Sequence, residues 1–180
     1  MIRWFVAAAV IATPLPAMAQ PGAAGFATRL QRVEDQLAIE RILVDYAAFL
    51  DGRDYARYAD LFTPDGEWVS DGGGGYKGRA AIRGMLESML GPTGAPNRSN
   101  YHIITNPRVD LAGDRATATS RFLFVMRGPD GRPTPALAGI YHDELVRQSG
   151  VWKIKRRVAD NIMPTSAEWR KIMPSAKTDK

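Results

Sequence analysis

The order of helical and strand patterns along the chain limits the folds that it can adopt. Apolar side chains recur with a helical period from residue 26 to residue 50, and we expect further helices at 54–62 and 79–90. Alternating stretches bounded by turn residues predict strands at 67–70, 101–111, 116–127, 137–149 and 151–159. Helices first and a run of strands afterwards predict an α+β domain, in which a curved antiparallel sheet folds over the N-terminal helices as a cone-shaped barrel and encloses a pocket.

The segments between these elements contain residues that favour turns and loops. "TPDG" at 63–66 predicts a turn, and the composition of 91–100 predicts a loop. The glycine-rich "DGGGGYKG" at 71–78 lacks the GK[ST] ending of a phosphate-binding loop, so we interpret it as a flexible hairpin or a pocket rim. The tail at 161–180 is expected to form a small closing helix or to be partly disordered.

Residues 1–19 have the features of a secretory signal peptide. A positive charge and an apolar run precede the small residues Ala17 and Ala19, which form an A-x-A cleavage site. The run is too short to span a bilayer, and a retained anchor is the alternative interpretation. We therefore expect a periplasmic or secreted protein that begins near Gln20 and has no stable membrane anchor.

We expect the exported chain to consist of a flexible N-terminus at 20–29, one domain at 30–160 and the tail. The sequence has no cysteine, which excludes disulfides, thiol nucleophiles and Cys-ligated metals. It contains 24 basic and 19 acidic residues, and its densest basic run, "KIKRR" at 153–157, lies in a strand pattern that indicates a solvated outer face. Nucleic acid is therefore not an expected partner. Two histidines and scattered carboxylates lack a metal-ligand spacing, so we expect no metal and no other cofactor.

Asp51 and His102 are the first candidates for chemistry. Asp51 in "FLDGRD" follows the long helical pattern, where the negative end of the helix dipole disfavours a carboxylate. A partner such as His102 would compensate, and a histidine oriented by an aspartate can remove a proton from carbon. The alternative is that Asp51 is an exposed turn residue that accepts hydrogen bonds from local amides. Taken alone, the residues favour this second interpretation.

The strand around residue 141 has two faces, and the pattern alone does not choose between them. The side chains on one face are those of Tyr141, Asp143, Leu145 and Arg147, and those on the other are His142, Glu144 and Val146. If the first face points inward, it lines a polar pocket, where Arg147 could hold an anion or an enolate-like oxygen. If the second face points inward, His142 is a buried structural residue.

Four segments in this order and spacing carry a family resemblance: "YAAFLDGRDYARYADLFTPDGEW", "GYKGRAAI", "YHIITNPRV" and "GIYHDELVRQSGVWKIKRR". They resemble the SnoaL-like branch of the nuclear transport factor 2-like superfamily, roughly from residue 30 to residue 158. The resemblance implies a cone-shaped α+β barrel with a deep pocket. It is specific for the fold and much less so for the reaction.

Among enzymes of this family, scytalone dehydratase and hexachlorocyclohexane dehydrochlorinase are similar at the positions that matter. The resemblance implies that Asp51 and His102 form a catalytic pair and that Arg147 is a pocket arginine. The sequence departs from the dehydrochlorinase at Tyr46, where that enzyme has a lysine, and from the dehydratase at Leu50, where that enzyme has a tyrosine.

The resemblance and the pattern together suggest an exported, cofactor-independent lyase or isomerase that acts on a small hydrophobic or ring-containing molecule. The alternatives are a non-catalytic small-molecule-binding protein and a dimeric interaction module. For each of these functions we expect a homodimer or homotrimer. Aromatic residues that could line the pocket, or simply belong to the core, are Tyr46, Tyr58, Trp68 and Tyr141.

Overall fold

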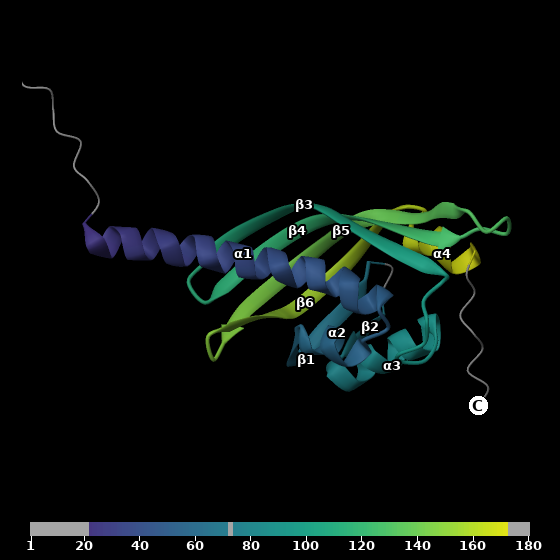
Figure 1. The fold of residues 1–180 in the computed structure, drawn as a ribbon, viewed down its shortest axis with the longest axis horizontal. Coiled ribbons are helices and arrows are strands. Elements are labelled where there is room, and N and C mark those ends of the chain that lie inside the picture. Colours follow the sequence, from purple (N-terminus) through teal and green to yellow (C-terminus); the bar gives the residue numbers. More distant parts are fainter. Residues whose placement is uncertain (1–21, 72–73, 173–180) are drawn as a thin grey trace, which may run out of the picture.

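The computed structural model describes residues 22–71 and 74–172, so the predicted signal peptide lies outside the described residues. The helices are α1 (Ala23–Asp51), α2 (Tyr55–Asp60), α3 (Arg79–Leu90) and α4 (Ser166–Ile172). The strands are β1 (Phe62–Ser70), β2 (Gly75–Lys77), β3 (Asn100–Ala112), β4 (Arg115–Arg127), β5 (Pro133–Gln148) and β6 (Val151–Met163). Figure 1 shows α1 lying across the sheet, with α2 and α3 below it.

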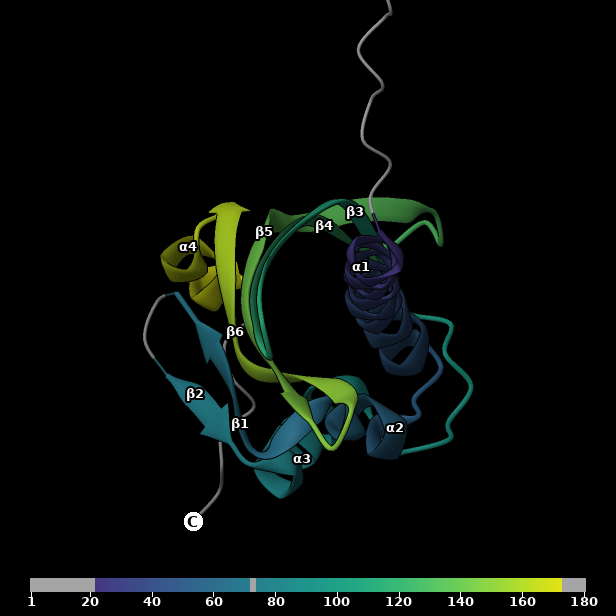
Figure 2. The ribbon, with the colours of Figure 1, turned by 90° about the vertical axis from the view of Figure 1, so that its left-hand side faces the viewer.

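The strands form one curved sheet of six strands in the order β2-β1-β6-β5-β4-β3. Its concave side faces α1, α2 and α3, as the view along α1 shows (Figure 2). This arrangement confirms the predicted α+β fold. The sheet is mixed rather than purely antiparallel, because β1 pairs with β6 in the parallel direction. It is also not closed, since β2 and β3 are its two ends.

Helix α1 packs on the concave side of the sheet through one apolar face. Ile39, Leu43, Tyr46 and Leu50 recur at helical spacing, and each is at most 4% exposed. The helix begins at Ala23, so residues 23–29, which we expected to be flexible, continue it. The alanine-rich start explains the extension, because alanine has the highest helix propensity.

The "TPDG" segment does not separate two elements as predicted. It lies within β1, where the pairing with β6 is irregular between Phe62 and Glu67. Gly66 permits this bulge, because an added Cβ would lie 3.0 Å from the Cβ of Phe62 and 3.1 Å from the carbonyl oxygen of Ile154. The bulge therefore lets one strand begin against the core and still reach β2.

A second bulge changes which residues of β6 face inward. Glu144 pairs with Arg156, but its neighbour Leu145 pairs with Ile154, so Lys155 is an extra residue. The parity of β6 therefore shifts, and Arg157 points into the core with 0% exposure. The prediction of a solvated outer face for 153–157 is wrong for Arg157.

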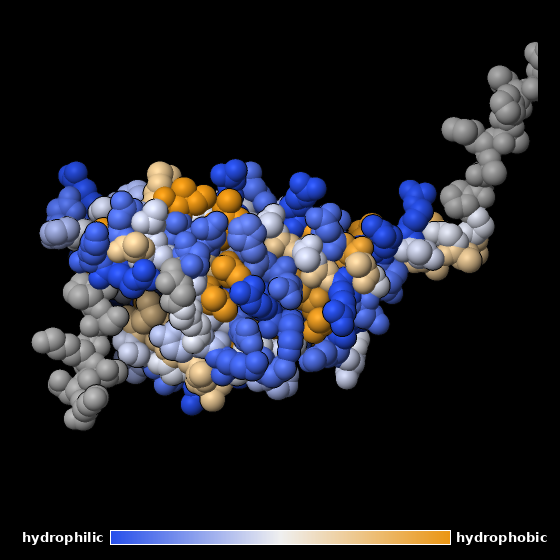
Figure 3. Space-filling view, turned by 180° about the vertical axis from the view of Figure 1, so that it is seen from behind, coloured by the Kyte–Doolittle hydropathy of each residue, from blue (hydrophilic) through white to orange (hydrophobic). Residues whose placement is uncertain are grey.

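The face of the sheet opposite α1 and the C-terminal tail complete the fold. The face of the molecule turned away from α1 is mainly hydrophilic, with hydrophobic side chains in separate spots (Figure 3). Helix α4 agrees with the predicted small closing helix, in the part of the tail that the structure describes. Within the described residues, no helix is long and apolar enough to cross a membrane.

Candidate active site

Asp51 and His102 meet at the C-terminal end of α1. Oδ1 of Asp51 lies 2.7 Å from Nδ1 of His102, and the backbone N–H of His102 donates to Oδ2 of Asp51 over 2.8 Å. The side chains are 9% exposed for His102 and 16% for Asp51. These donors compensate a carboxylate that the helix dipole disfavours, so the interpretation of Asp51 as an exposed turn residue does not hold.

The second ring nitrogen of His102 is free to act on a bound molecule. Nε2 has no hydrogen-bond partner among residues 22–71 and 74–172, and it is not among their fully buried unpaired atoms. An ionised carboxylate can only accept hydrogen bonds, so in the neutral ring Nδ1 carries the proton and Nε2 presents a lone pair. The ring packs on Phe124, with the two centroids 4.5 Å apart.

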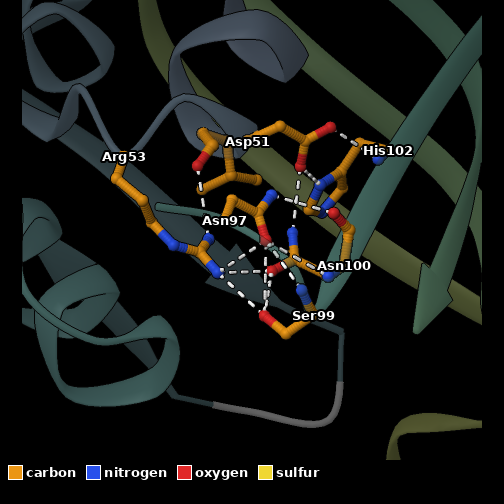
Figure 4. A network of polar contacts seen from close by, with 7 residues as sticks. Asp51, Arg53, Asn97, Ser99, Asn100 and His102 are labelled. Atoms are coloured by element: carbon orange, nitrogen blue, oxygen red, sulfur yellow. Dashed lines mark hydrogen bonds and ion pairs between the residues drawn. The ribbon is translucent and has the colours of Figure 1, made fainter. Parts of the chain in front are cut away.

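Asn100 contacts the Asp51 carboxylate, and Arg53 contacts Asn100 (Figure 4). Nδ2 of Asn100 donates to Oδ1 of Asp51 over 3.0 Å, and Nη2 of Arg53 donates to Oδ1 of Asn100 over 2.6 Å. The first bond fixes the orientation of the Asn100 amide, and the second holds that amide in place. Arg53 therefore acts on the Asp51–His102 dyad through Asn100.

Arg53 also ties the end of α1 to the loop that leads into β3. Its Nη2 donates to Oδ1 of Asn97 over 3.2 Å and to Oγ of Ser99 over 3.1 Å, and the residue is only 2% exposed. Its φ of 56° lies in the left-handed region, which is uncommon for a residue with a side chain. The guanidinium of Arg53 thus contacts the loop that leads into β3 from the turn after α1.

The four residues predicted to bind substrate come together inside the curved sheet. The ring centroid of Tyr46 lies 4.6 Å from that of Tyr58 and 5.4 Å from that of Tyr141. Nε1 of Trp68 donates to the hydroxyl of Tyr46 over 3.1 Å. Tyr46, Tyr58 and Tyr141 are buried, so they also form part of the core, as the alternative interpretation expected.

A row of rings on β4 links this cluster with the dyad. Phe124 packs on His102, and Phe122 stacks on Tyr141 with centroids 4.3 Å apart. Residues two apart on a strand point to the same face, so Phe122 and Phe124 are neighbours on the inner side of the sheet. The inner surface beside His102 is therefore flat and aromatic.

Burial keeps Tyr58 and Tyr141 protonated. It raises the pKa of Tyr58 and of Tyr141 well above the ordinary value, and the nearby Tyr46 raises both further. The positive charge of Arg157 opposes this effect but does not cancel it. Both phenols can therefore donate a hydrogen bond at neutral pH.

Arg157 is the buried cation of this interior. It forms a two-point pair with Asp143, in which Nε–Oδ1 and Nη2–Oδ2 are both 2.7 Å, and neither side chain is exposed. Its guanidinium also lies over the ring of Tyr46 at 3.9 Å and over that of Tyr141 at 4.3 Å. Burial alone would lower the pKa of Arg157, but the charge and hydrogen bonds of Asp143 raise it, so the group stays charged.

The face of β5 that carries Tyr141 points inward, as one of the two alternatives predicted. Arg147 nevertheless does not lie beside the dyad. Tyr141, Asp143 and Leu145 are buried, whereas His142 is exposed. Nη2 of Arg147 lies 2.5 Å from Oδ2 of Asp35, on the same helix as Asp51.

Arg147 therefore lies far from the position that we predicted for it. Asp35 precedes Asp51 by 16 residues, which is about 24 Å at roughly 1.5 Å per residue. Arg147 also pairs with Asp114, with Nε–Oδ1 at 3.0 Å, and packs on the ring of Trp152. It fastens the middle of α1 to the sheet instead of contacting His102, because β5 is long and its end lies beside that part of the helix.

Sequence reasoning missed the residues that support the dyad. Arg53 stands in the same "FLDGRD" stretch as Asp51, and the polar run "NRSN" at 97–100 supplies its partners. That run signalled a loop, and side chains of this kind often hydrogen-bond nearby groups. Nothing local signalled the inward turn of Arg157, because it depends on the bulge in β6. Within the described residues no group of His, Asp and Glu is arranged to hold a metal ion.

Comparisons with known proteins agree with this fold. Residues 31–158 match the family model described as SnoaL-like domain. The chain belongs to the SnoaL-like domain family. This SnoaL-like protein is 28% identical over 131 residues to a gamma-hexachlorocyclohexane dehydrochlorinase of Sphingobium indicum, which covers 72% of this chain and 82% of the relative.

Two solved structures are similar to this chain in fold. A putative scytalone dehydratase of Novosphingobium aromaticivorans is 32% identical, with a TM-score of 0.63, and the match covers 73% of this SnoaL-like protein and 87% of that chain. An NTF2-like protein with a cystatin-like fold from the same species is 22% identical, with a TM-score of 0.74 over 86% of this chain and 99% of its own, and shows the fold alone. The relatives thus include enzymes named for two eliminations, dehydrochlorination and dehydration.

Proposed function

We propose that this SnoaL-like protein is an exported, cofactor-independent lyase or isomerase whose general base is His102. The observation that carries the proposal is the 2.7 Å contact between Nδ1 of His102 and Oδ1 of Asp51, which leaves Nε2 unpaired. An oriented imidazole with a free nitrogen is suited to removing a proton from carbon. The eliminations named for the relatives require such a step.

The proposed reaction begins when Nε2 of His102 takes a proton from a carbon of the bound molecule. For an elimination, the electrons of the broken C–H bond form a C=C bond, and the leaving group departs from the adjacent carbon with its bonding pair. A halide leaves as the anion, whereas a hydroxyl takes a proton from the imidazolium of His102 and leaves as water. For an isomerisation, the proton returns to a different carbon. Asp51 stabilises the imidazolium that forms in either case.

The substrate class follows from the surroundings of His102. Phe124 lies against the imidazole, and Phe122 continues the aromatic surface toward Tyr141. A flat apolar wall of this kind suits a small hydrophobic or ring-shaped molecule. The protonated phenol of Tyr141 is the group best suited to stabilise negative charge that develops on it, a role that the sequence prediction gave to Arg147 together with Tyr141.

The test is a screen of small halogenated and hydroxylated ring compounds, with products identified by mass spectrometry. For any compound that reacts, we expect His102→Gln to lower kcat/KM by about 10² to 10⁴, because general-base help typically contributes that much. Asp51→Asn should also lower it strongly, since the amide no longer stabilises the imidazolium. The chelator EDTA should leave the rate unchanged.

His142→Gln is the matched control, because its side chain is 50% exposed and lies outside the site. Turnover that survives His102→Gln would refute the assignment of the base. Binding of a ring compound without conversion, and without exchange of its carbon-bound hydrogen in D₂O, would support the non-catalytic binding function instead.

A further inference from the structure

Helix α1 has a second apolar face that no described element covers. We call it the outer stripe; its residues are Phe26, Leu30, Val33, Leu37 and Val44, which are 66%, 47%, 54%, 59% and 60% exposed. At about 100° per residue, this stripe lies opposite the buried face that includes Ile39 and Leu43. Its spacing of four, three and four residues is the heptad pattern of paired helices.

The outer stripe is unusual for a surface helix. A helix that packs on one sheet normally carries polar residues on the opposite side. Here the N-terminal end of α1 also projects beyond the sheet (Figure 1). An open groove of about 380 Å³ runs beside it, between α1 and β3, and is lined by Val33, Val109 and Leu111 among others. A partner that follows α1 would cover both the stripe and the edge of this groove.

We propose that the outer stripe pairs with the outer stripe of a second copy of this chain, with the two helices parallel. In this arrangement Phe26, Leu30, Val33 and Leu37 each face the same residue of the second copy. Because each α1 buries its other face on its own sheet, the two domains lie on opposite sides of the helix pair and do not collide. The stripe has charged residues on both flanks, so it fits one helix rather than a larger bundle.

The charges beside the stripe favour the parallel direction. Arg29 and Glu34 flank it on opposite sides, and within the described residues neither forms an ion pair or a side-chain hydrogen bond. In a parallel pair of helices, a residue on one flank lies beside the residue five positions later on the opposite flank of the other helix. Arg29 of each copy therefore faces Glu34 of the other. An antiparallel pair that places Val33 against Leu37 would bring the two Glu34 side chains together.

Glu40 limits the length of the seam. It occupies the stripe position between Leu37 and Val44, where a parallel pair would oppose two carboxylates. The seam therefore consists of the four layers from Phe26 to Leu37. This is a small interface, so we expect a reversible dimer whose population rises with protein concentration.

The first test is sedimentation velocity of the purified protein over a wide concentration range. We expect a monomer–dimer equilibrium, and we expect Leu30→Asp to raise the dissociation constant by about tenfold or more, because it buries a charge in the seam. Met89→Asp is the matched control, since Met89 is an apolar residue on another helix and is 63% exposed. Exchanging the flanking charges one at a time should weaken the dimer, and Arg29→Glu combined with Glu34→Arg should restore it.

The second test uses the absence of native cysteine to determine the direction. In a parallel pair Leu30→Cys lies opposite itself, so it should form an intermolecular disulfide on mild oxidation. Cross-linking only between Leu30→Cys and Glu40→Cys would overturn the parallel arrangement.

Three other results would also overturn the proposal. The first is a monomer at every concentration, and the second is a dimer or trimer that Leu30→Asp leaves intact. The third is a monomer that binds phospholipid vesicles through the same stripe, which would identify a lipid surface as the occupant.

Discussion

At the scale of single residues, the dyad depends on how Arg53 connects two distant segments. The guanidinium holds Asn97, Ser99 and Asn100, and Asn100 in turn holds the Asp51 carboxylate. Because Arg53 is buried, water cannot replace these bonds easily if the side chain is lost. The geometry of His102 is thus set from outside the pair.

We expect Arg53→Met to destabilise the protein by about 1 to 3 kcal/mol, because it removes the donor that the partly buried side chains of Asn97 and Asn100 share. Urea unfolding monitored by tryptophan fluorescence measures the change. Arg98→Met is the matched control in the same polar run, since Arg98 is exposed, and it should change stability little. Equal effects of the two substitutions would contradict the role given to Arg53. If the protein turns over a compound, Arg53→Met should lower kcat more than it raises KM.

At the scale of elements, α1 is held on the sheet by a polar contact as well as by its apolar face. Asp35 accepts hydrogen bonds from Arg147 over 2.5 Å and from Nε1 of Trp152 over 3.1 Å. Burial acts to raise the pKa of Asp35, but the hydrogen bonds from Arg147, Trp152 and Gln31 outweigh it and lower the pKa. The ionised carboxylate is therefore the form that stabilises the fold.

This pKa shift predicts a pH dependence. A folded-state pKa below the unfolded value near ~3.9 gives a stabilisation that is complete above that value and is lost as pH falls through the folded-state pKa. We expect Asp35→Asn to be less stable than wild type at neutral pH, and the difference to shrink below about pH 4. Urea unfolding at several pH values measures it.

Asp114→Asn is the control for this experiment, because Asp114 pairs with the same arginine but is 79% exposed, and it should have the smaller effect. The result that would argue against a charged Asp35 is a difference in the free energy of unfolding between wild type and Asp35→Asn that does not shrink as pH falls. The measurement has to extend to about pH 2 to 3, on the order of one unit below an ordinary Asp pKa.

Asp143 on β5 and Arg157 on β6 lie opposite each other and form a buried ion pair. We expect Asp143→Asn to destabilise the protein by about 3 to 5 kcal/mol, because it leaves the Arg157 cation buried without its counter-charge. Thermal unfolding measures the loss. The double variant Asp143→Leu with Arg157→Met should recover most of it, since well-packed apolar residues can replace a buried pair. A single variant as stable as wild type would show that the cation is compensated by the rings of Tyr46 and Tyr141 alone.

At the scale of the whole molecule, export is the remaining proposal, and it concerns residues outside those that the structure describes. Expressed from its full sequence in a Gram-negative host, the protein should appear in the periplasmic fraction with Gln20 as its first residue. Mass spectrometry of the intact protein measures this end. Replacing both Ala17 and Ala19 with Asp should block cleavage, because the cleavage site requires small residues. An uncleaved wild-type chain would favour the retained anchor.

Much of the fold could be predicted from local patterns. The helical period of α1, the alternation of β3 to β6 and the turn residues between them depend on neighbours along the chain, so the sequence reports them directly. The partnership of Asp51 with His102 was predicted through the family resemblance, because the residues taken alone favoured an exposed turn residue.

The tertiary structure alone decided which charged residues face the interior. The extra residue Lys155 reverses the parity of β6 and buries Arg157, which a regular alternation would have left outside. Arg147 has the inward parity of β5, yet the length of that strand places it beside Asp35 rather than His102. The parallel pairing of β1 with β6 was likewise invisible in the local pattern. Bulges and pairings between distant segments depend on contacts made only after the chain has folded, and no local period records them.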